Sequence, residues 1–227
     1  MKFSTSLFNI HTHQANPNKG KFIQSLHNHF EKVETHGKFS IGLHPWFIEE
    51  ENWKKEMGSI LECCQHKNVA AIGECGLDNL CDTDFHLQKN VFIQQVILAN
   101  KIHKPLIIHC VRAWQEVLHL LHMNNDNVPV IFHGFNGKLS IVKQIVNEGY
   151  YLSFGKAILY KPFLLEVLRF LPISKLFLET DDDDISIETI YQAASNALEI
   201  DINSLSLQIN KNAADVLGVH FFNNDDE

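Results

Sequence analysis

The stretch from Pro105 to His133, PLIIHCVRAWQEVLHLLHMNNDNVPVIFH, contains two short apolar runs, and each run ends in a histidine. Between them, Arg112 to Met123 places apolar side chains three and four positions apart, which is the spacing of an amphipathic helix. A strand, a helix and a second strand in this order predict a parallel pairing of the two strands. We therefore expect an α/β protein whose strands end in residues that can bind metal.

The same alternation extends along the chain in both directions. Seven apolar runs rich in β-branched and aromatic residues predict strands, and a weaker eighth covers Phe22 to Leu26. The seven are Phe3 to Ile10, Phe39 to Leu43, Val69 to Gly73, Pro105 to His109, Val128 to His133, Tyr150 to Phe154 and Lys175 to Glu179. The predicted helices are Asn52 to His66, Asp84 to His103, Arg112 to Met123, Lys138 to Asn147, Pro162 to Leu171, Ile187 to Leu198 and Asn203 to Leu217.

Two architectures fit this alternation, an open doubly wound sheet and a closed barrel. Four strands end at or beside a residue that can bind metal, and a fifth runs through Glu179 to Asp181. In a barrel the carboxyl ends of the strands converge on one mouth, whereas in an open sheet they spread along an edge. We therefore predict an α/β fold of the TIM-like (β/α) barrel type, short and distorted, with seven or eight mainly parallel strands. The segment from Gln14 to Lys38 is too short for a full set of helices, so one helix is expected to be missing there.

The composition predicts one domain, residues 1–227, because hydrophobic residues make up 45% of the chain and no Gly/Ser-rich or Pro-rich linker divides it. No apolar run approaches the ~20 residues that cross a bilayer. The first ten residues lack the features of a signal peptide. The five cysteines are an odd number without Cys-x-x-Cys spacing, which favours reduced thiols and no structural zinc knuckle. We expect a cytoplasmic protein that does not contact membranes.

The formal net charge is -8, and the negative charges gather in Asp181 to Asp184 and in Asp225 to Glu227. The rest of the chain is nearly neutral, so it lacks the basic footprint of a protein that holds nucleic acid by neutralising phosphates alone. Any phosphate chemistry therefore needs bound cations.

His11 and His13 stand at the end of an apolar strand, where side chains two positions apart point the same way. A chance pair is the alternative, because the chain has 14 histidines. Glu74 also ends an apolar strand, where a carboxylate is costly unless it is paired or bound to a metal. A salt bridge is therefore the alternative for Glu74.

His109 and His133 each follow an apolar strand, and Asp181 follows another. The alternative for His109 and His133 is that they are hydrogen-bonded histidines of the core, and the alternative for Asp181 is a solvated acidic loop. The six candidates offer four imidazoles and two carboxylates, enough to hold two divalent cations about 3.5 to 4 Å apart with a shared water. Mixed nitrogen and oxygen donors suit zinc, manganese or iron, and magnesium is also compatible.

These motifs occur in the order found in the TatD family of metal-dependent deoxyribonucleases, within the amidohydrolase superfamily, and the sequence resembles that family over nearly its full length. Ile72 to Asp78 resembles the Gly-Glu-x-Gly-Leu-Asp motif, the most specific of the matches. The other matching segments are Phe8 to His13, Ile41 to Trp46, Gln88 to Ala99, Pro105 to Cys110, Phe132 to Gly137, Gly149 to Gly155, Leu178 to Asp181 and Asn210 to Leu217.

The resemblance implies two metal ions that share Glu74 as a bridging ligand. The first is held by His11, His13, Glu74 and Asp181, and the second by Glu74, His109 and His133. Two cations would lower the pKa of a shared water and neutralise charge on the phosphoryl oxygens. Glu74 and Asp181 are the implied catalytic residues, with Asp181 as the candidate general base. The implied activity is exonuclease-like removal of nucleotides from DNA ends or short oligonucleotides.

Three positions depart from the family. Asn9 replaces an aspartate near the metal ligands by a neutral amide. Val111 occupies the place of an arginine, so that Arg112 is shifted by one position, and the loop after Asp181 is acidic instead of basic. The candidate substrate contacts are His44, Arg112, Asn136 and Lys156. Trp46 and Trp114 are candidates for stacking on a base, and helix packing is the alternative interpretation of Trp114.

Three functions follow from these observations. The first is a two-metal DNase of the TatD type. The second is a related amidohydrolase that acts on a small-molecule ester or amide, which the acidic loop favours. The third is a non-catalytic barrel that binds a partner, which Asn9 favours. We expect the first, because all six ligand positions keep competent side chains, while the native metal and any protein partner are not identified by the sequence.

Overall fold

Strands and helices alternate along the chain as expected. The computed structural model describes residues 6–14, 21–125 and 128–219. Its strands are β1 (Phe8–Thr12), β2 (Lys21–Leu26), β3 (Phe39–Ile41), β4 (Val69–Asp78), β5 (Leu106–Val111), β6 (Val130–Phe132), β7 (Tyr151–Phe154) and β8 (Leu176–Leu178). Its α-helices are α1 (Trp53–Cys63), α2 (Phe85–Ile102), α3 (Trp114–Asn124), α4 (Leu139–Asn147), α5 (Pro162–Phe170), α6 (Ile187–Leu198) and α7 (Ile202–Leu217).

The chain divides into two compact parts, which are described separately. The middle part runs from Gln24 to Phe132, and the end part combines Met1–Ile23 with His133–Glu227. The predicted single domain over residues 1–227 stays a prediction. None of the described helices combines the length and the apolar character that a membrane crossing requires.

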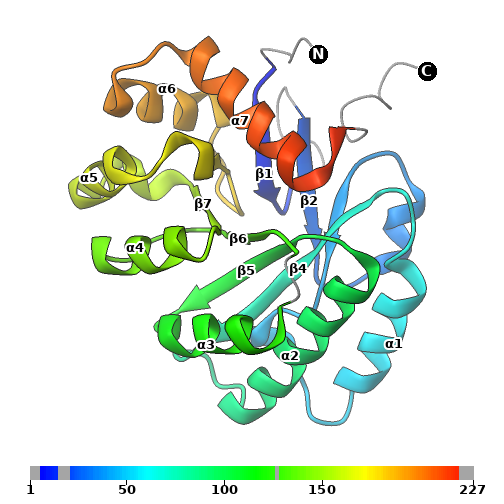
Figure 1. Cartoon of the computed structure of the whole chain (residues 1–227). Helices are drawn as coiled ribbons and strands as arrows, with labels where there is room; N and C mark the ends of the chain where they lie inside the picture. The colour runs from blue at the N-terminus through cyan, green and yellow to red at the C-terminus, as the bar shows by residue number, and fades with distance from the viewer. Residues whose placement is uncertain (1–5, 15–20, 126–127, 220–227) are drawn as a thin grey trace. The chain divides into compact units, whose positions relative to one another are not determined.

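The middle part is a parallel sheet in which neighbouring strands follow the chain order from β2 to β6. Its central strands are apolar and fully buried, as in Leu106, Ile107 and Ile108 of β5. Helix α2 packs against β4 and α3, and α3 packs against β5 (Figure 1, cyan to green). The predicted parallel βαβ unit between Pro105 and His133 is confirmed in β5, α3 and the parallel pairing of β5 with β6.

Two glycines of β4 allow this strand to lie close to β5. Gly73 and Gly76 have φ angles of 147° and 142°, which side chains rarely adopt. A Cβ atom at Gly76 would overlap the carbonyl oxygen of His109, and one at Gly73 would overlap that of Ile107. The Gly-Glu-x-Gly spacing therefore brings β4 against the strand that carries His109.

In the end part, β7 pairs in parallel with β8, and β1 meets the end of β8 through a parallel bridge between Thr12 and Asp181. Helix α7 packs against β1 (Figure 1), and both α6 and α7 donate hydrogen bonds to the backbone at the start of this segment. The hydroxyl of Tyr191 on α6 donates to the Phe8 carbonyl at 2.9 Å and accepts from the Phe8 N–H at 3.1 Å. On α7, Asn210 donates to the carbonyl of Ser6 at 2.8 Å. These bonds fix the strand that carries His11.

The element boundaries differ from the predictions in a few places. Strand β4 extends to Asp78, beyond the predicted end at Gly73, because its glycines permit continued pairing with β5. The first strand was predicted to end at Ile10, but β1 ends at Thr12, so His11 lies inside the strand. The predicted residues 3–5 of that strand lie outside the described residues. Before α1, the helical elements in the described part of the chain are short 3-10 helices, with no α-helix, in agreement with the expected missing helix.

Candidate functional site

The end part gathers four of the six predicted ligands, His11, His13, His133 and Asp181, and we call this group the Asp181 cluster. Backbone pairing builds it. The Asp181 N–H donates to the carbonyl of His11 at 3.1 Å, and the His13 N–H donates to the carbonyl of Asp181 at 3.0 Å. Asp181 has a φ of 56°, a left-handed conformation that aspartate tolerates better than most residues. The end of β8 is thereby held beside the end of β1.

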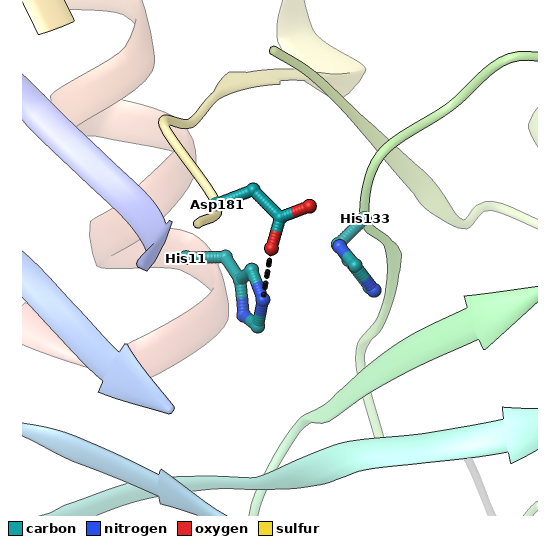
Figure 2. A group of neighbouring side chains, drawn as sticks. All are labelled: His11, His133 and Asp181. Atoms are coloured by element: carbon teal, nitrogen blue, oxygen red, sulfur yellow. Dashed lines mark ion pairs between the residues drawn. The ribbon is translucent and has the colours of Figure 1, made fainter. Parts of the chain in front are cut away.

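One carboxylate oxygen lies at the centre of this cluster. Asp181 Oδ1 is 3.3 Å from Nε2 of His11 and 3.4 Å from Nε2 of His13. The ring of His133 lies 4.3 Å from that of His11, between centroids. Figure 2 shows that Asp181, His11 and His133 come from separate segments. One ligand atom of each lies within 4.8 Å of the others. This is a compact group of nitrogen and oxygen donors.

Asp181 is held in its charged form. Burial alone would raise its pKa, but hydrogen bonds from His11 and His13 and the charge of His133 outweigh burial, so the pKa of Asp181 lies well below its usual range. The carboxylate is therefore ionised at neutral pH and available to a cation.

A chain of short polar side chains supports the Asp181 cluster. The Asn9 amide donates to Thr180 Oγ1 at 2.8 Å, and Thr180 Oγ1 donates to Thr12 Oγ1 at 3.1 Å. Thr12 Oγ1 in turn donates to the carbonyl of Asp181 at 3.2 Å. Asn9 thus acts as a donor at the start of this chain, a role that an ionised aspartate would not fill. The predicted departure at Asn9 has a structural use in this protein.

Glu179 is a functional candidate to which the sequence analysis assigned no role. It is fully buried, and its Oε1 accepts from the Gly134 N–H at 2.6 Å and lies 3.7 Å from Nδ1 of His133. A buried carboxylate behind a histidine orients the ring and raises its basicity. The feature of the sequence that could have identified Glu179 is its position at the end of an apolar strand, two residues before Asp181.

The middle part holds the other two predicted ligands, Glu74 and His109, together with His44 and Asp78, and we call this group the Glu74 cluster. Glu74 Oε1 lies 3.1 Å from Nδ1 of His109 and 3.2 Å from Nε2 of His44. Glu74, His44 and His109 each offer a ligand atom within 4.8 Å of the others. The side chain of Glu74 is only 5% exposed, so its charge requires these partners.

Asp78 stands on the other side of His109. Residues four apart on a strand share a face, and both Glu74 and Asp78 of β4 reach His109. Asp78 Oδ2 lies 3.2 Å from Nε2 of His109 and accepts from the indole N–H of Trp46 at 2.6 Å. Burial would raise the pKa of Asp78, but hydrogen bonds from Trp46, the Leu80 N–H and His109 lower it below its usual value. The sequence placed Asp78 in a motif without assigning it a role.

These contacts distinguish the two histidines. Nε2 of His109 faces Asp78 and Nδ1 faces Glu74, so a neutral ring, which carries one proton, can donate to only one of these carboxylates, and a cation at the other nitrogen would relieve the approach of two acceptors. His44 is oriented the opposite way, because its Nδ1 accepts the Trp46 backbone N–H at 3.1 Å. Its Nε2 then carries the proton and donates to Glu74. His109 is therefore the candidate metal ligand of the two, while His44 donates to the carboxylate of Glu74.

Two buried glutamines of α2 position the Glu74 cluster. Gln95 bonds both backbone groups of Leu43, accepting from its N–H at 2.7 Å and donating to its carbonyl at 3.1 Å. Gln88 accepts from the Asp78 N–H at 2.9 Å and donates to the Asp78 carbonyl at 3.0 Å. The helix thus fixes the segment before His44 and the end of β4. The family resemblance included both glutamines, but gave no reason for them.

The remaining predicted substrate contacts lie at the surface or in ion pairs. Arg112 is exposed, with a φ of 49° directly after β5, and Asn136 is exposed. Lys156 is paired with Asp183, with Nζ 2.7 Å from Oδ1. Trp114 packs near Phe132, with 5.6 Å between ring centroids, which fits its alternative interpretation as helix packing. The assignments of His44, Arg112, Asn136 and Lys156 to substrate contacts stay predictions.

Both clusters suit divalent cations. Each combines imidazole nitrogens with carboxylate oxygens in partly or fully buried positions, a donor set that zinc and manganese accept. The structure groups His133 with His11 and Asp181, and it groups Glu74 with His109. The bridging role of Glu74 stays a prediction from the family resemblance.

Comparison with known proteins adds three findings. The uncharacterized metal-dependent hydrolase YabD of Bacillus subtilis is 33% identical over 146 residues, covering 63% of this chain and 57% of YabD. The 3'-5' ssDNA/RNA exonuclease TatD of Citrobacter koseri is 30% identical over 62% of this chain and 55% of its own length. The chain therefore spans less than two thirds of the curated relatives that it matches. The solved structure of YjjV, a TatD homolog from Escherichia coli, covers 94% of this chain and 98% of its own, with a TM-score of 0.81 at 21% identity.

The likeness to YjjV confirms the predicted α/β barrel fold, since the match includes nearly all of both chains. The TatD related DNase family matches residues 7–218, which contain every predicted ligand. The chain therefore belongs to the TatD related DNase family.

Proposed function

We propose that the protein is a metal-dependent hydrolase that cleaves phosphodiester bonds at the ends of DNA or short oligonucleotides. The observation that carries this proposal is the pair of clusters around Asp181 and Glu74, each with nitrogen and oxygen donors within reach of one cation. Membership of the TatD family supports it, as do relatives named as a metal-dependent hydrolase and as an exonuclease.

Each cluster is proposed to hold one divalent ion, zinc, manganese or magnesium. In the Asp181 cluster the donors are His11, His13, His133 and Asp181, and in the Glu74 cluster they are Glu74 and His109. The family resemblance assigns His133 to the second ion and gives Glu74 to both ions, and this bridging role of Glu74 is retained in the proposal. When bound, such ions supply an activated water and neutralise the charge that develops on phosphoryl oxygens. A chain with a net charge of -8 needs that positive charge to hold a phosphodiester.

The residues of the chain have separate tasks in this reaction. Asp181 is the general base that accepts a proton from the attacking water. Its low pKa keeps the carboxylate charged, and so unprotonated, at neutral pH. A carboxylate with such a low pKa is a weak base. Its effect therefore comes from direct contact with the water and not from a pKa close to neutral pH. Asp78 orients the ring of His109. Glu179 performs the corresponding task behind His133.

The test is hydrolysis of end-labelled single-stranded DNA by protein loaded with manganese, magnesium or zinc. We expect shortening of the labelled strand one nucleotide at a time. Because His109→Ala and Asp181→Asn each remove a ligand, both are expected to lower the rate at least about a hundredfold. A metal-loaded protein that leaves DNA and RNA oligonucleotides intact would refute the assigned substrate.

A second function, hydrolysis of a small-molecule ester or amide, has one structural observation in its favour. Lys156, a candidate phosphate contact, is paired with Asp183 of the acidic loop. A neutralised lysine gives less attraction for a polyanion. Carboxylic esters and lactones tested beside the oligonucleotides distinguish the two functions. The non-catalytic alternative predicts less than one tightly bound metal ion per chain, which elemental analysis measures.

A further inference from the structure

Among the described Trp, Tyr and Phe side chains of the middle part, that of Trp46 is the most exposed. Its indole is nevertheless held by a hydrogen bond. The residue is 57% exposed, and its neighbours Phe47 and Leu80 are 49% and 61% exposed. Its indole N–H donates to Asp78 Oδ2 at 2.6 Å. Tryptophan that serves only as packing is mostly buried, whereas an exposed indole with a bonded N–H presents a held apolar surface to solvent.

Asp78 ties this surface to the metal ligand His109. The same oxygen that accepts from the indole lies 3.2 Å from Nε2 of His109, while Asp78 Oδ1 accepts from the Leu80 N–H at 2.8 Å. Gln88 bonds the Asp78 backbone on both sides. One carboxylate, itself fixed, therefore sets the position of Trp46 relative to His109.

The ring geometry leaves Trp46 available for stacking. Its ring is nearly perpendicular to that of His44, at 87° and 4.9 Å between centroids, and to that of His109, at 76° and 5.9 Å. Neither contact is a parallel stack. An exposed, oriented indole close to a phosphodiester site matches the way in which proteins hold unpaired bases without reading their sequence.

We propose that Trp46 stacks on the unpaired base of the terminal nucleotide and thereby favours single-stranded ends as substrates. This inference rests on the proposed function of the Glu74 cluster, and it names the substrate feature that the site recognises. Trp46 is a specificity-determining residue in this proposal, and Asp78 is a positioning residue that keeps the indole and His109 at a fixed separation. A terminal base in a duplex is paired and stacked, so it binds less well.

Binding provides a test that does not depend on turnover. Fluorescence anisotropy with manganese-loaded protein compares a short phosphorothioate oligothymidine with the same strand lacking the base at its 3' end or its 5' end. We expect the wild type to bind the complete strand about tenfold more tightly than one of the abasic strands. Trp46→Ala is expected to remove this preference, and Trp46→Phe to keep part of it. Trp53→Ala, a tryptophan in the same part of the chain, is the control and should behave like the wild type.

Asp78→Asn tests the positioning role separately. It weakens the acceptor of the indole N–H, while the indole side chain itself is kept. A reduced base preference with an increased KM is expected. Base-dependent binding that needs Trp46, in a protein that cleaves no DNA, would overturn the proposed function but support stacking. Cleavage with a base preference unchanged in Trp46→Ala would overturn the stacking proposal and support the function. Absence of binding to any of the strands would overturn both.

Discussion

Three histidines surround one carboxylate in the Asp181 cluster, whereas in the Glu74 cluster two carboxylates contact one histidine, His109. The supports differ as well. Backbone pairing of β1 with β8 and the polar chain from Asn9 hold the first cluster. Glycines of β4 and the amides of Gln88 and Gln95 hold the second.

This difference shows that the same kinds of metal-binding side chain, histidines and carboxylates, can be positioned by different structural supports. The Asp181 cluster depends on strands and hydroxyl groups, and the Glu74 cluster depends on a close strand contact and on one helix. Substitutions that remove a support of one cluster should therefore affect that cluster first. The following predictions test this difference in supports.

The largest effect is expected from Gly76→Ala. The added methyl group would overlap the carbonyl of His109 at a φ of 142°, so β5 must shift. We expect a loss of about 3 kcal/mol or more in the free energy of unfolding and the loss of metal from the Glu74 cluster. Chemical denaturation and elemental analysis measure both. The control is Gly58→Ala in α1, where a Cβ meets nothing within 4 Å and where stability should rise by about 0.5 to 1 kcal/mol.

A smaller effect is expected from Gln95→Leu, which leaves the buried N–H and carbonyl of Leu43 without the amide partner. Two buried polar groups that lose a hydrogen bond cost about 2 to 4 kcal/mol in total. The Glu74 cluster should also bind metal more weakly, because the segment that carries His44 loosens. Gln94→Leu, an exposed neighbour on the same helix, is the matched control. Equal stability of the two variants would contradict the role given to α2.

In the Asp181 cluster, Thr180→Val removes the hydroxyl between Asn9 and Thr12 while keeping the size of the side chain. The expected cost is about 1 to 3 kcal/mol, because the amide of Asn9 is left buried without its acceptor. Metal should be lost from the Asp181 cluster and retained in the Glu74 cluster. The control is Thr35→Val, which changes an exposed hydroxyl. Equal loss of metal from both clusters in Thr180→Val would contradict the assignment of this support to the Asp181 cluster.

The smallest effect concerns Lys104, which lies in the middle part but outside either cluster. Burial lowers its pKa below the usual 10.5. Between the native pKa and that value, the unfolded chain binds more protons than the native chain, so the contribution of Lys104 to stability increases as pH rises. Denaturation of the wild type and of Lys104→Met from pH 7 to pH 10 measures it. As pH rises, the free energy of unfolding of the wild type should increase relative to that of the variant. A relative decrease would contradict the predicted direction.

Much of the fold was predictable because apolar periodicity determines where the elements lie. Helix α6, Ile187–Leu198, has the bounds that the spacing predicted. The extension of β4 to Asp78 was not predictable, because it depends on how closely Gly73 and Gly76 allow β5 to approach. That contact is long-range, and no local pattern in the sequence states it.

The metal-ligand candidates were predictable because each follows an apolar strand, where a charged or basic side chain is costly without a function. Their supports were not. The polar chain from Asn9 to Asp181 joins residues about 170 positions apart, as in the bond from Asn9 to Thr180. The orientation of His109 depends on Asp78 and Trp46, which local spacing does not connect. Such contacts are fixed only by the tertiary structure.

The most direct test of the central claim, that each cluster holds its own divalent ion, is the metal content per chain of the wild type, His133→Ala and His109→Ala after loading with zinc or manganese. Two ions are predicted for the wild type and one for each variant. Fewer than two ions in the wild type, or a variant that retains both ions or loses both, would contradict the account.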